Sequence, residues 1–291
     1  MVKPVVINSL NYVQGSRNQF IYNFPSEMTF KTGDKIGLQS LSIFNSTFNI
    51  SQVFGNNTFS MSFPIANSSN QLFYQTLNVT IPDGYYTVSD LNYFLQSQMI
   101  ANNLYLVNST SQENVYFLEF TTNSVQYVLQ INSYPIYTQS QATALGLTLP
   151  NGASWKLPSV SYCPQITLCQ GLGTYFGMTT LTLPPVSNYS QIFNQTSQTV
   201  PIVSTVNSNL ITINIVNSKY SKPNNILYSL ALPTSSYATQ LSVNNNLSDN
   251  AMIDINAGKY TQLVITFLDQ NFNKLYLNDY EIVLILNIAT S

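Results

Sequence analysis

Short stretches in which hydrophobic and polar residues alternate run through most of the chain. The alternation is clearest near the middle, where Ile211, Ile213 and Ile215 fall on one face of an extended strand. Asn, Gly, Pro and Ser separate these stretches, which is typical of sandwiches and barrels. The pattern predicts an all-β protein, an antiparallel single jelly-roll sandwich with extra strands. The expected strands are Val5–Val13, Gln19–Phe24, Lys35–Phe48, Thr58–Phe63, Gln71–Ile81, Val115–Thr121, Val125–Ile131, Asn209–Val216, Asn225–Leu232, Tyr260–Leu268 and Glu281–Ile288.

The segment Ile282–Leu286 is apolar at every position. A run of this kind indicates a strand that is covered on both sides, so we expect it at the centre of the sandwich. It is the longest apolar run of the chain and is far shorter than the roughly 20 residues of a membrane-spanning helix. The first ten residues lack the apolar core of a secretory signal. We therefore expect a soluble protein without a membrane span.

One segment departs from the two-residue period. Thr87 is suited to cap a helix, and Asp90 follows three residues later, as in a variant of the capping box. Apolar side chains then recur at three- and four-residue spacing. They are Val88, Leu91, Leu95 and Met99. The spacing predicts one helix over residues 88–101, which would cover an edge of a sheet.

The composition changes between residues 133 and 201, where prolines and glycines are frequent and sequence patterns of long regular strands are scarce. A plain loop of this length is uncommon in a compact domain, so we predict an inserted, Pro/Gly-rich β/loop subdomain. The predicted organisation is a first part of the jelly roll over 1–132, including the helix, the insertion over 133–201, and the closing strands of the jelly roll over 202–291.

Charged side chains are scarce. The 291 residues include nine basic and eleven acidic ones, 7% in total, and no histidine, whereas about 25% is usual for soluble domains. An uncharged polar surface costs less to desolvate, and the cores of protein interfaces are poor in charge and rich in aromatic residues. The composition therefore predicts that much of the surface contacts other protein. A net charge of −2 without a basic cluster excludes nucleic acid as a partner.

The two cysteines, Cys163 and Cys169, are six residues apart. A zinc site needs four ligands, and neither histidine nor a nearby acidic residue completes the set. We expect no metal site and two buried thiols. A local disulfide is the alternative, and it would require an oxidising compartment or the outside of a particle.

The chain offers little for catalysis, because the absence of histidine removes the most frequent general base and the histidine-dependent triads. Among the acidic residues, only Asp279 and Glu281 are two apart, a spacing that on a strand would suit calcium binding or glycoside hydrolysis. A cluster in water at the start of a strand is the simpler interpretation. Gly171–Gly177 superficially resembles a nucleotide-binding loop, but its third glycine is one place late and lysine is missing, which favours a tight turn. We predict no catalytic residue, no cofactor and no enzyme.

Two stretches carry a family resemblance. Residues 81–92, Ile-Pro-Asp-Gly-Tyr-Tyr-Thr-Val-Ser-Asp-Leu-Asn, resemble the turn and helix of minor capsid (penton) proteins of virophages and Polinton-type elements, and mavirus-like virophages are nearest. Residues 260–271 and 275–283 resemble that family's closing pair of strands, with Thr-Phe-Leu-Asp-Gln-Asn at a sheet edge and Leu-Asn-Asp-Tyr-Glu leading into the last strand. The polar residues of both motifs are expected to cap, turn and pair, and none matches a catalytic position.

The resemblance implies a structural protein of the virion. Its fold would be a single jelly roll, five copies of which form a homopentamer at each fivefold vertex of an icosahedral shell. The partners would be trimers of a double-jelly-roll major capsid protein, and the insertion would face outward. Assembly would take place in the host cytoplasm or a viral factory. Contact with a host receptor is left open.

Two other functions fit the composition. The 20 tyrosines could stack on sugar rings, so a carbohydrate- or receptor-binding β-sandwich module of a fibre or adhesin is the main alternative. Tyrosine is equally preferred at protein interfaces, so composition does not separate this alternative from a capsid role. A glycosidase using Asp279 and Glu281 is the third hypothesis.

Overall fold

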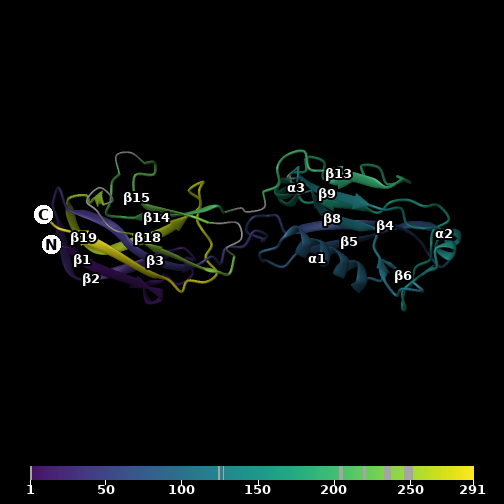
Figure 1. Cartoon of the computed structure of the whole chain (residues 1–291), viewed down its shortest axis with the longest axis horizontal. Coiled ribbons are helices and arrows are strands. Elements are labelled where there is room, and N and C mark those ends of the chain that lie inside the picture. The colour runs from purple at the N-terminus through teal and green to yellow at the C-terminus, as the bar shows by residue number, and fades with distance from the viewer. Residues whose placement is uncertain are drawn as a thin grey trace. The chain divides into compact units, whose positions relative to one another are not determined.

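The computed structural model describes residues 2–123, 125–126, 128–202, 206–218, 221–232, 237–245 and 252–291. The chain forms two compact units (Figure 1). Unit 1 combines Met1–Phe48 with Ser204–Ser291, and unit 2 is the continuous segment Asn49–Val203.

Unit 1 consists of two antiparallel sheets. In the first sheet the strand order is β1 (Val2–Asn8), β19 (Val283–Ala289), β3 (Lys35–Phe44) and β16 (Gln240–Asn244), and β17 (Ile253–Asp254) also pairs with β3. In the second sheet the order is β15 (Ile226–Ala231), β14 (Ser208–Ile213), β18 (Gly258–Leu268) and β2 (Gln19–Phe30). A short 3₁₀ helix, η1 (Ser9–Asn11), follows β1.

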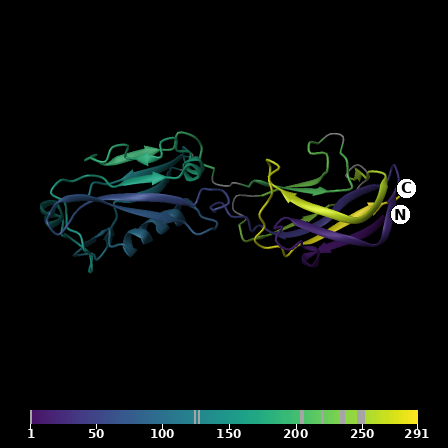
Figure 2. The same cartoon turned by 180° about the vertical axis from the view of Figure 1, so that it is seen from behind.

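The order of these strands is that of a jelly roll. Without the two-residue β17, the described residues of unit 1 form eight strands. Numbered in chain order, they follow the order first-eighth-third-sixth in one sheet and second-seventh-fourth-fifth in the other. Two four-stranded sheets with these crossings are the double Greek key of the jelly roll. Since Val2 pairs with Ala289, the two ends of the chain lie together (Figures 1 and 2). The predicted fold class is confirmed for unit 1.

Strand β19 shows which faces of the jelly roll are covered. It lies between β1 and β3, as expected for a central strand. Its side chains alternate, however: Leu284, Leu286 and Ile288 are buried between the sheets, whereas Val283 on the opposite face is exposed. The prediction that this segment is covered on both sides is therefore wrong, because the described part of the chain provides a partner layer for only one face of its sheet.

The described residues of unit 2 form three further sheets and three helices. The strand orders are β12 (Thr182–Leu183), β11 (Gln165–Leu168), β4 (Thr58–Ala66), β5 (Leu72–Thr80); then β13 (Phe193–Thr196), β9 (Val128–Ser133), β8 (Leu118–Asn123); and β10 (Leu147–Thr148), β6 (Leu106–Asn108), β7 (Asn114–Val115). The helices are α1 (Val88–Ala101), α2 (Gln139–Ala144) and α3 (Gln170–Phe176).

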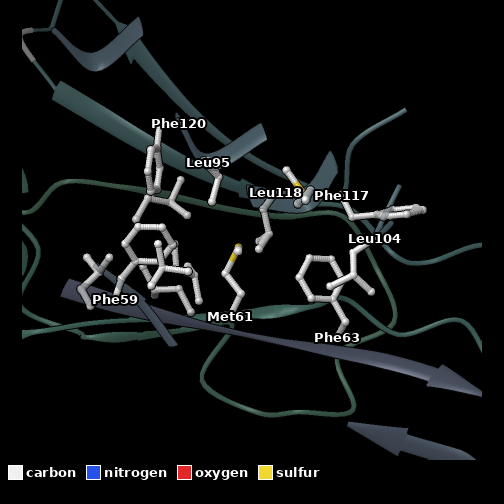
Figure 3. Close-up of a cluster of buried hydrophobic side chains, with 14 of the residues drawn as sticks. Phe59, Met61, Phe63, Leu95, Leu104, Phe117, Leu118 and Phe120 are labelled. Carbon is white, nitrogen blue, oxygen red and sulfur yellow. The ribbon is translucent and has the colours of Figure 1, made fainter. Parts of the chain in front are cut away.

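A single apolar cluster holds unit 2 together. Strand β4 contributes Phe59, Met61 and Phe63 from alternate positions, and all three are buried. They share the cluster with side chains from α1 and β8, including Leu95 and Phe120 (Figure 3). Burial of large side chains at this density supplies most of the stability of a unit of this size.

Helix α1 has the predicted bounds, Val88–Ala101. The Oδ2 atom of Asp90 accepts from the backbone N of Thr87 at 2.8 Å, and the backbone N of Asp90 donates to Oγ1 of Thr87 at 3.1 Å, which completes the capping box. The helix also covers a sheet edge, as predicted, because Oδ1 of Asn92 accepts from the backbone N of Phe120 on the edge strand β8 at 2.9 Å.

The extent of the insertion differs from the prediction. It was expected at 133–201, but unit 2 begins at Asn49, so helix α1 and strands β4 to β9 belong to the insertion and not to the jelly roll. The cause is that β4 pairs with β5 and β11, all within unit 2. Alternation along a strand identifies its buried face but not the strand with which it pairs.

Both ends of unit 2 meet at Tyr175, a buried residue of α3. At the beginning of the unit, Nδ2 of Asn49 donates to the hydroxyl of Tyr175 at 2.8 Å. Near its end, the backbone N of Ile202 donates to the carbonyl oxygen of Tyr175 at 2.8 Å. One residue thus fastens the first and last parts of the insertion together.

Each of the eleven predicted strands overlaps a strand of the structure, although residue 127 within Val125–Ile131 lies outside the described residues. Helices α2 and α3 and several short strands were not predicted. Among the described residues, no helix has the length and apolarity to cross a membrane.

Asp34 gives unit 1 a pH-dependent contribution to stability. Its carboxylate accepts from the backbone N atoms of Lys31 and Ser291, each at 2.8 Å, and these bonds hold its pKa below the usual 3.8. A lowered pKa means that the unfolded chain binds the proton more readily, so the contribution is present above pH 3.8 and is lost as the pH falls through the lowered pKa.

We expect Asp34→Asn to destabilise unit 1 at neutral pH and to make its stability depend less on pH in acid, measured by hydrogen exchange in β3 and β19. Asp254→Asn, at an exposed position of β17, is the control and should leave the acid transition unchanged.

Candidate functional site

The carboxylate pair singled out by the sequence lies in a turn. Asp279 and Glu281 precede β19, so they do not share a strand face. Oδ1 of Asp279 accepts from the backbone N of Glu281 at 2.9 Å, and the backbone N of Asp279 donates to Oγ of Ser46 at 2.8 Å. Both contacts shape the chain entering the last strand. Within the described ranges, no three side chains of the His, Cys, Asp or Glu type come together as metal ligands.

The glycine-rich stretch 171–177 forms helix α3 and its end, not the predicted tight turn. A Cβ at Gly171 would lie 2.3 Å from the carbonyl oxygen of Gly55, and Gly177 ends the helix with φ of 72°. The glycines therefore allow two backbone segments, at Gly55 and Thr199, to approach the helix closely. A structural role accounts for all three glycines of the stretch without a nucleotide.

Both cysteines are free thiols. Cys163 is buried, as predicted, and its Sγ donates to the carbonyl oxygen of Gln191 at 2.9 Å; burial raises the pKa of this thiol. Cys169 is only partly buried and caps α3, where its Sγ accepts from the backbone N of Leu172 at 3.4 Å. The prediction of two buried thiols therefore holds for Cys163 alone.

The first motif, residues 81–92, is a structural turn in unit 2. Oδ1 of Asp83 accepts from the backbone N of Gln52 at 2.9 Å, and Gly84 pairs with Ile50 through backbone bonds in both directions. The hydroxyl of Tyr86 donates to the carbonyl oxygen of Pro82 at 2.9 Å. These contacts fix the turn that leads into α1.

The second motif closes the jelly roll. Strand β18 lies between β14 and β2, so its expected position at a sheet edge is corrected to a central one. At its end, Oδ1 of Asp269 accepts from the backbone N atoms of Asn271 and Asn273, each at 2.8 Å. Nδ2 of Asn278 donates to the carbonyl oxygen of Ser46 at 2.7 Å. The polar residues of this motif turn and pair the backbone.

A different feature of unit 1 has the properties of an interaction site: the face of the first sheet that points away from the second sheet. The outer face is formed by side chains that alternate with the buried ones and are cross-strand neighbours. They are Val2, Pro4, Val6, Asn8, Val283, Ile285, Asn287, Ala289, Ser40, Ser42, Phe44, Gln240, Ser242 and Asn244. None of these residues is charged. Two residues of opposite charge, Lys35 opposite Ala289 and Asp254 opposite Lys35, lie on the same face at its margin.

The most apolar part of the outer face runs along β1 and β19. Val2, Val6 and Val283 are exposed there, and Val6 keeps 50% of its surface in contact with solvent. Monomeric proteins rarely leave contiguous apolar surface uncovered, and interface cores combine apolar side chains with an absence of charge. We call Val2, Val6, Val283 and Ile285 the β1–β19 strip.

A rigid loop presents another apolar side chain at the end of β1. Leu10 in η1 is 90% exposed. The turn is fixed because Oδ1 of Asn8 accepts from the backbone N of Leu10 at 3.0 Å and Oδ1 of Asn11 accepts from the backbone N of Asn8 at 3.0 Å. An apolar side chain on a preorganised backbone loses little entropy on binding, which is typical of interface anchors.

Unit 2 has an open groove beside α2. Its volume is about 960 Å³, and its lining includes Thr138, Gln139, Ser140 and Thr143 together with Leu149 and Leu157. Within the described part of the chain, the lining contains no aromatic side chain that could stack on a sugar ring. The groove therefore gives no specific support to a carbohydrate-binding module.

Charge depletion in the sequence predicted the chemistry of such a surface but not its location. The signal that could have found it is the alternation in Val2, Val6 and Val283, three apolar residues out of phase with the buried Val5, Ile7 and Leu284. A half-buried strand normally carries polar residues in that phase.

The jelly roll and its charge-poor outer face thus define unit 1 as a β-sandwich with an exposed surface suited to protein association. No protein-family model matches the sequence. No curated protein matches it either.

Two solved structures are similar to this chain over its whole length. The mavirus penton protein is 9% identical, with a TM-score of 0.42, and 100% of each chain is covered. A chain of the cryo-EM structure of the Sputnik virophage is 13% identical, with a TM-score of 0.39, and the match covers 100% of this chain and 97% of that one. Both come from virophages, the group that the two sequence motifs resemble. At this level of identity and superposition, neither similarity assigns a function.

Proposed function

We propose that this chain is a structural capsid protein that forms homopentamers at the fivefold vertices of an icosahedral virus particle and has no catalytic activity. The observation that carries the proposal is the partly apolar outer face of the jelly roll, with the exposed β1–β19 strip and charges only at its margin, at Lys35 and Asp254. The resemblance of residues 81–92 and 260–283 to penton proteins gives independent support from the sequence.

A closed ring of five copies needs two different patches on each subunit, because its interfaces are heterologous. We assign the β1–β19 strip to one of these patches. Identical neighbours also carry identical charges, so a surface that is poor in charge limits repulsion around the ring. In this proposal the remaining partners are trimers of the major capsid protein, and the protein resides in the virion after assembly in the host cytoplasm or a viral factory.

The proposal predicts the mass of the purified protein in solution. Light scattering over a concentration series should detect a species of about five times 32.5 kDa. Val6→Asp should abolish this fivefold species, because each interface would then bury an unpaired carboxylate in an apolar contact.

Val125→Asp is the matched control, since Val125 is also exposed but lies in unit 2. It should leave the mass unchanged. A protein that never enters capsids, or shells that close their vertices without it, would refute the capsid role. If the wild-type protein is a monomer at every concentration and Val6→Asp still enters capsids, the β1–β19 strip is not part of the ring.

A further inference from the structure

Strand β5 in unit 2 has an open edge. It pairs with β4 along all nine of its residues and is the outermost strand of its sheet. In the described parts of the chain, no other backbone group bonds to the backbone of residues 72–80, although the hydroxyl of Tyr74 donates to the carbonyl oxygen of Ser187 at 3.1 Å. An edge of this kind presents a row of free N–H and C=O groups that can pair with another strand.

Three other edge strands in the described parts of the chain are protected. Strand β1 contains Lys3 and Pro4, strand β2 contains Pro25 and Glu27, and the edge of β8 is covered by Asn92 of α1. Charge, proline and a covering helix are the usual means of preventing strand pairing. The sequence of β5, Leu-Phe-Tyr-Gln-Thr-Leu-Asn-Val-Thr, has no charge, proline or glycine. Strand β5 therefore lacks these means of protection over nine residues, and its first three side chains are exposed.

The strand is complementary to a second copy of itself. In an antiparallel pair with a two-fold axis at Thr76, the central contact is threonine on threonine. On the face toward the core, Phe73 of each copy would lie opposite Val79 of the other. Thr–Thr and aromatic–β-branched pairs are among the favoured cross-strand neighbours. No like charges are brought together, because the strand has none.

Pairing would also cover apolar surface at the margin of the core. The core-facing row of β5 is Phe73, Gln75, Leu77 and Val79, opposite buried residues of β4. Only Val79 of this row is buried; Leu77 is half-buried and Phe73 is exposed. A strand added at the edge would extend the sheet over these side chains, which contributes roughly 25 cal/mol for each Å² of apolar surface removed from water.

We propose that unit 2 associates with a second copy of this chain by antiparallel pairing of β5 with β5 about a two-fold axis at Thr76. The two four-stranded sheets then become one sheet of eight strands. This contact is independent of the ring proposed above, because it uses unit 2 and the ring patch lies on unit 1.

Disulfide trapping tests the register. Directly opposed residues in an antiparallel pair have Cα atoms about 4.5–5.5 Å apart, a separation that a disulfide can bridge. Thr76→Cys, made in a Cys169→Ser background to remove the partly exposed thiol, should shift under mild oxidation from monomer to covalent dimer on a non-reducing gel. Serine retains the cap of α3. Asn194→Cys, at an exposed position of the edge strand β13, is the control and should stay monomeric.

A charge at the axis tests the association without a covalent bond. Thr76→Lys places two lysines opposite each other and should abolish the two-fold contact. In the Val6→Asp background, where the ring is absent, the mass at high concentration should fall from about twice 32.5 kDa to 32.5 kDa. Thr167→Lys puts the same charge on the same face of the sheet, on the interior strand β11, and should have no effect.

Absence of the dimer in Thr76→Cys, or equal cross-linking of Thr76→Cys and Asn194→Cys, overturns the proposal. A cross-link that persists when Val6→Asp is added supports it even if the ring does not form. Absence of the ring alone would therefore contradict the function proposed above, and absence of the cross-link alone would contradict the β5 contact.

Discussion

Replacing Phe63 with alanine is expected to lower the free energy of unfolding of unit 2 by about 3–5 kcal/mol. Phe63 is fully buried in the middle of β4 and belongs to the cluster that also contains Leu104 and Phe117 (Figure 3). The loss of stability has two parts. One is the free energy of transferring the ring out of water, and the other is the cost of the cavity that remains among side chains from several elements.

The chain carries its own reporter for this measurement. Its one tryptophan, Trp155, is buried in the same cluster, so urea unfolding followed by tryptophan fluorescence monitors unit 2. Phe54→Ala is the control, because Phe54 is partly exposed and its loss should cost less than about 1 kcal/mol. Equal costs for the two variants would show that the cluster does not determine the stability of unit 2.

Gly177→Ala is expected to cost about 3 kcal/mol of the stability of unit 2. Gly177 has φ of 72°, a conformation that costs an alanine about 1 kcal/mol or more. In addition, a Cβ at this position would lie 2.2 Å from the carbonyl oxygen of Thr199, and backbone cannot move aside as a flexible side chain can. The backbone N of Thr199 donates to the carbonyl oxygen of Gly177 at 3.1 Å, so any shift also disturbs this bond.

Gly55→Ala separates the two contributions. Gly55 has φ of 62° in the same unit, but a Cβ there meets no atom within 4 Å. It should therefore cost only the conformational part, and the difference between the two midpoints in urea, again from Trp155 fluorescence, measures the clash with Thr199. If both substitutions cost the same, the close approach of this segment to α3 contributes nothing.

Local signals in the sequence predicted local structure well. Helix α1 was predicted with its bounds because the reciprocal bonds of Thr87 and Asp90 depend only on residues three apart. The alternation of Ile211 and Ile213 likewise needs no information from elsewhere in the chain. Strand β16, Gln240–Asn244, was missed because its two half-buried residues, Leu241 and Val243, are flanked by residues typical of loops.

Properties that depend on distant segments could not be read from the pattern. The start of the insertion was misplaced because β4 has the same alternation whether it pairs within a jelly roll or within unit 2. Helix α3 was missed because Gly171 and Gly173 have low intrinsic helix propensity, and only their contacts with Gly55 and Leu181 explain why glycine is needed there.

The candidate site was predictable in kind and not in place. Scarcity of charge indicated a surface for protein association, but which strands carry that surface depends on the pairing of β1 with β19, at opposite ends of the sequence. For the carboxylates of Asp279 and Glu281, in contrast, the sequence indicated a place and the wrong kind of site. Their spacing suggested a catalytic or calcium site, but the bonds of Asp279 to Ser46 and Glu281 form a turn.

The meeting of both ends of unit 2 at Tyr175 bears on how the chain folds. If the insertion were unstructured, β3 and β14 would be joined by a loop of about 150 residues, and closing it would cost about 2 kcal/mol more entropy than closing a loop of about 10. Once unit 2 has folded, the bonds from Asn49 and Ile202 to Tyr175 reduce that loop to a short tether. Unit 2 is contiguous in sequence and can fold during synthesis, whereas the jelly roll must wait for β18 and β19. The insertion thereby acts as a folding template that brings the two halves of the jelly roll within reach of each other.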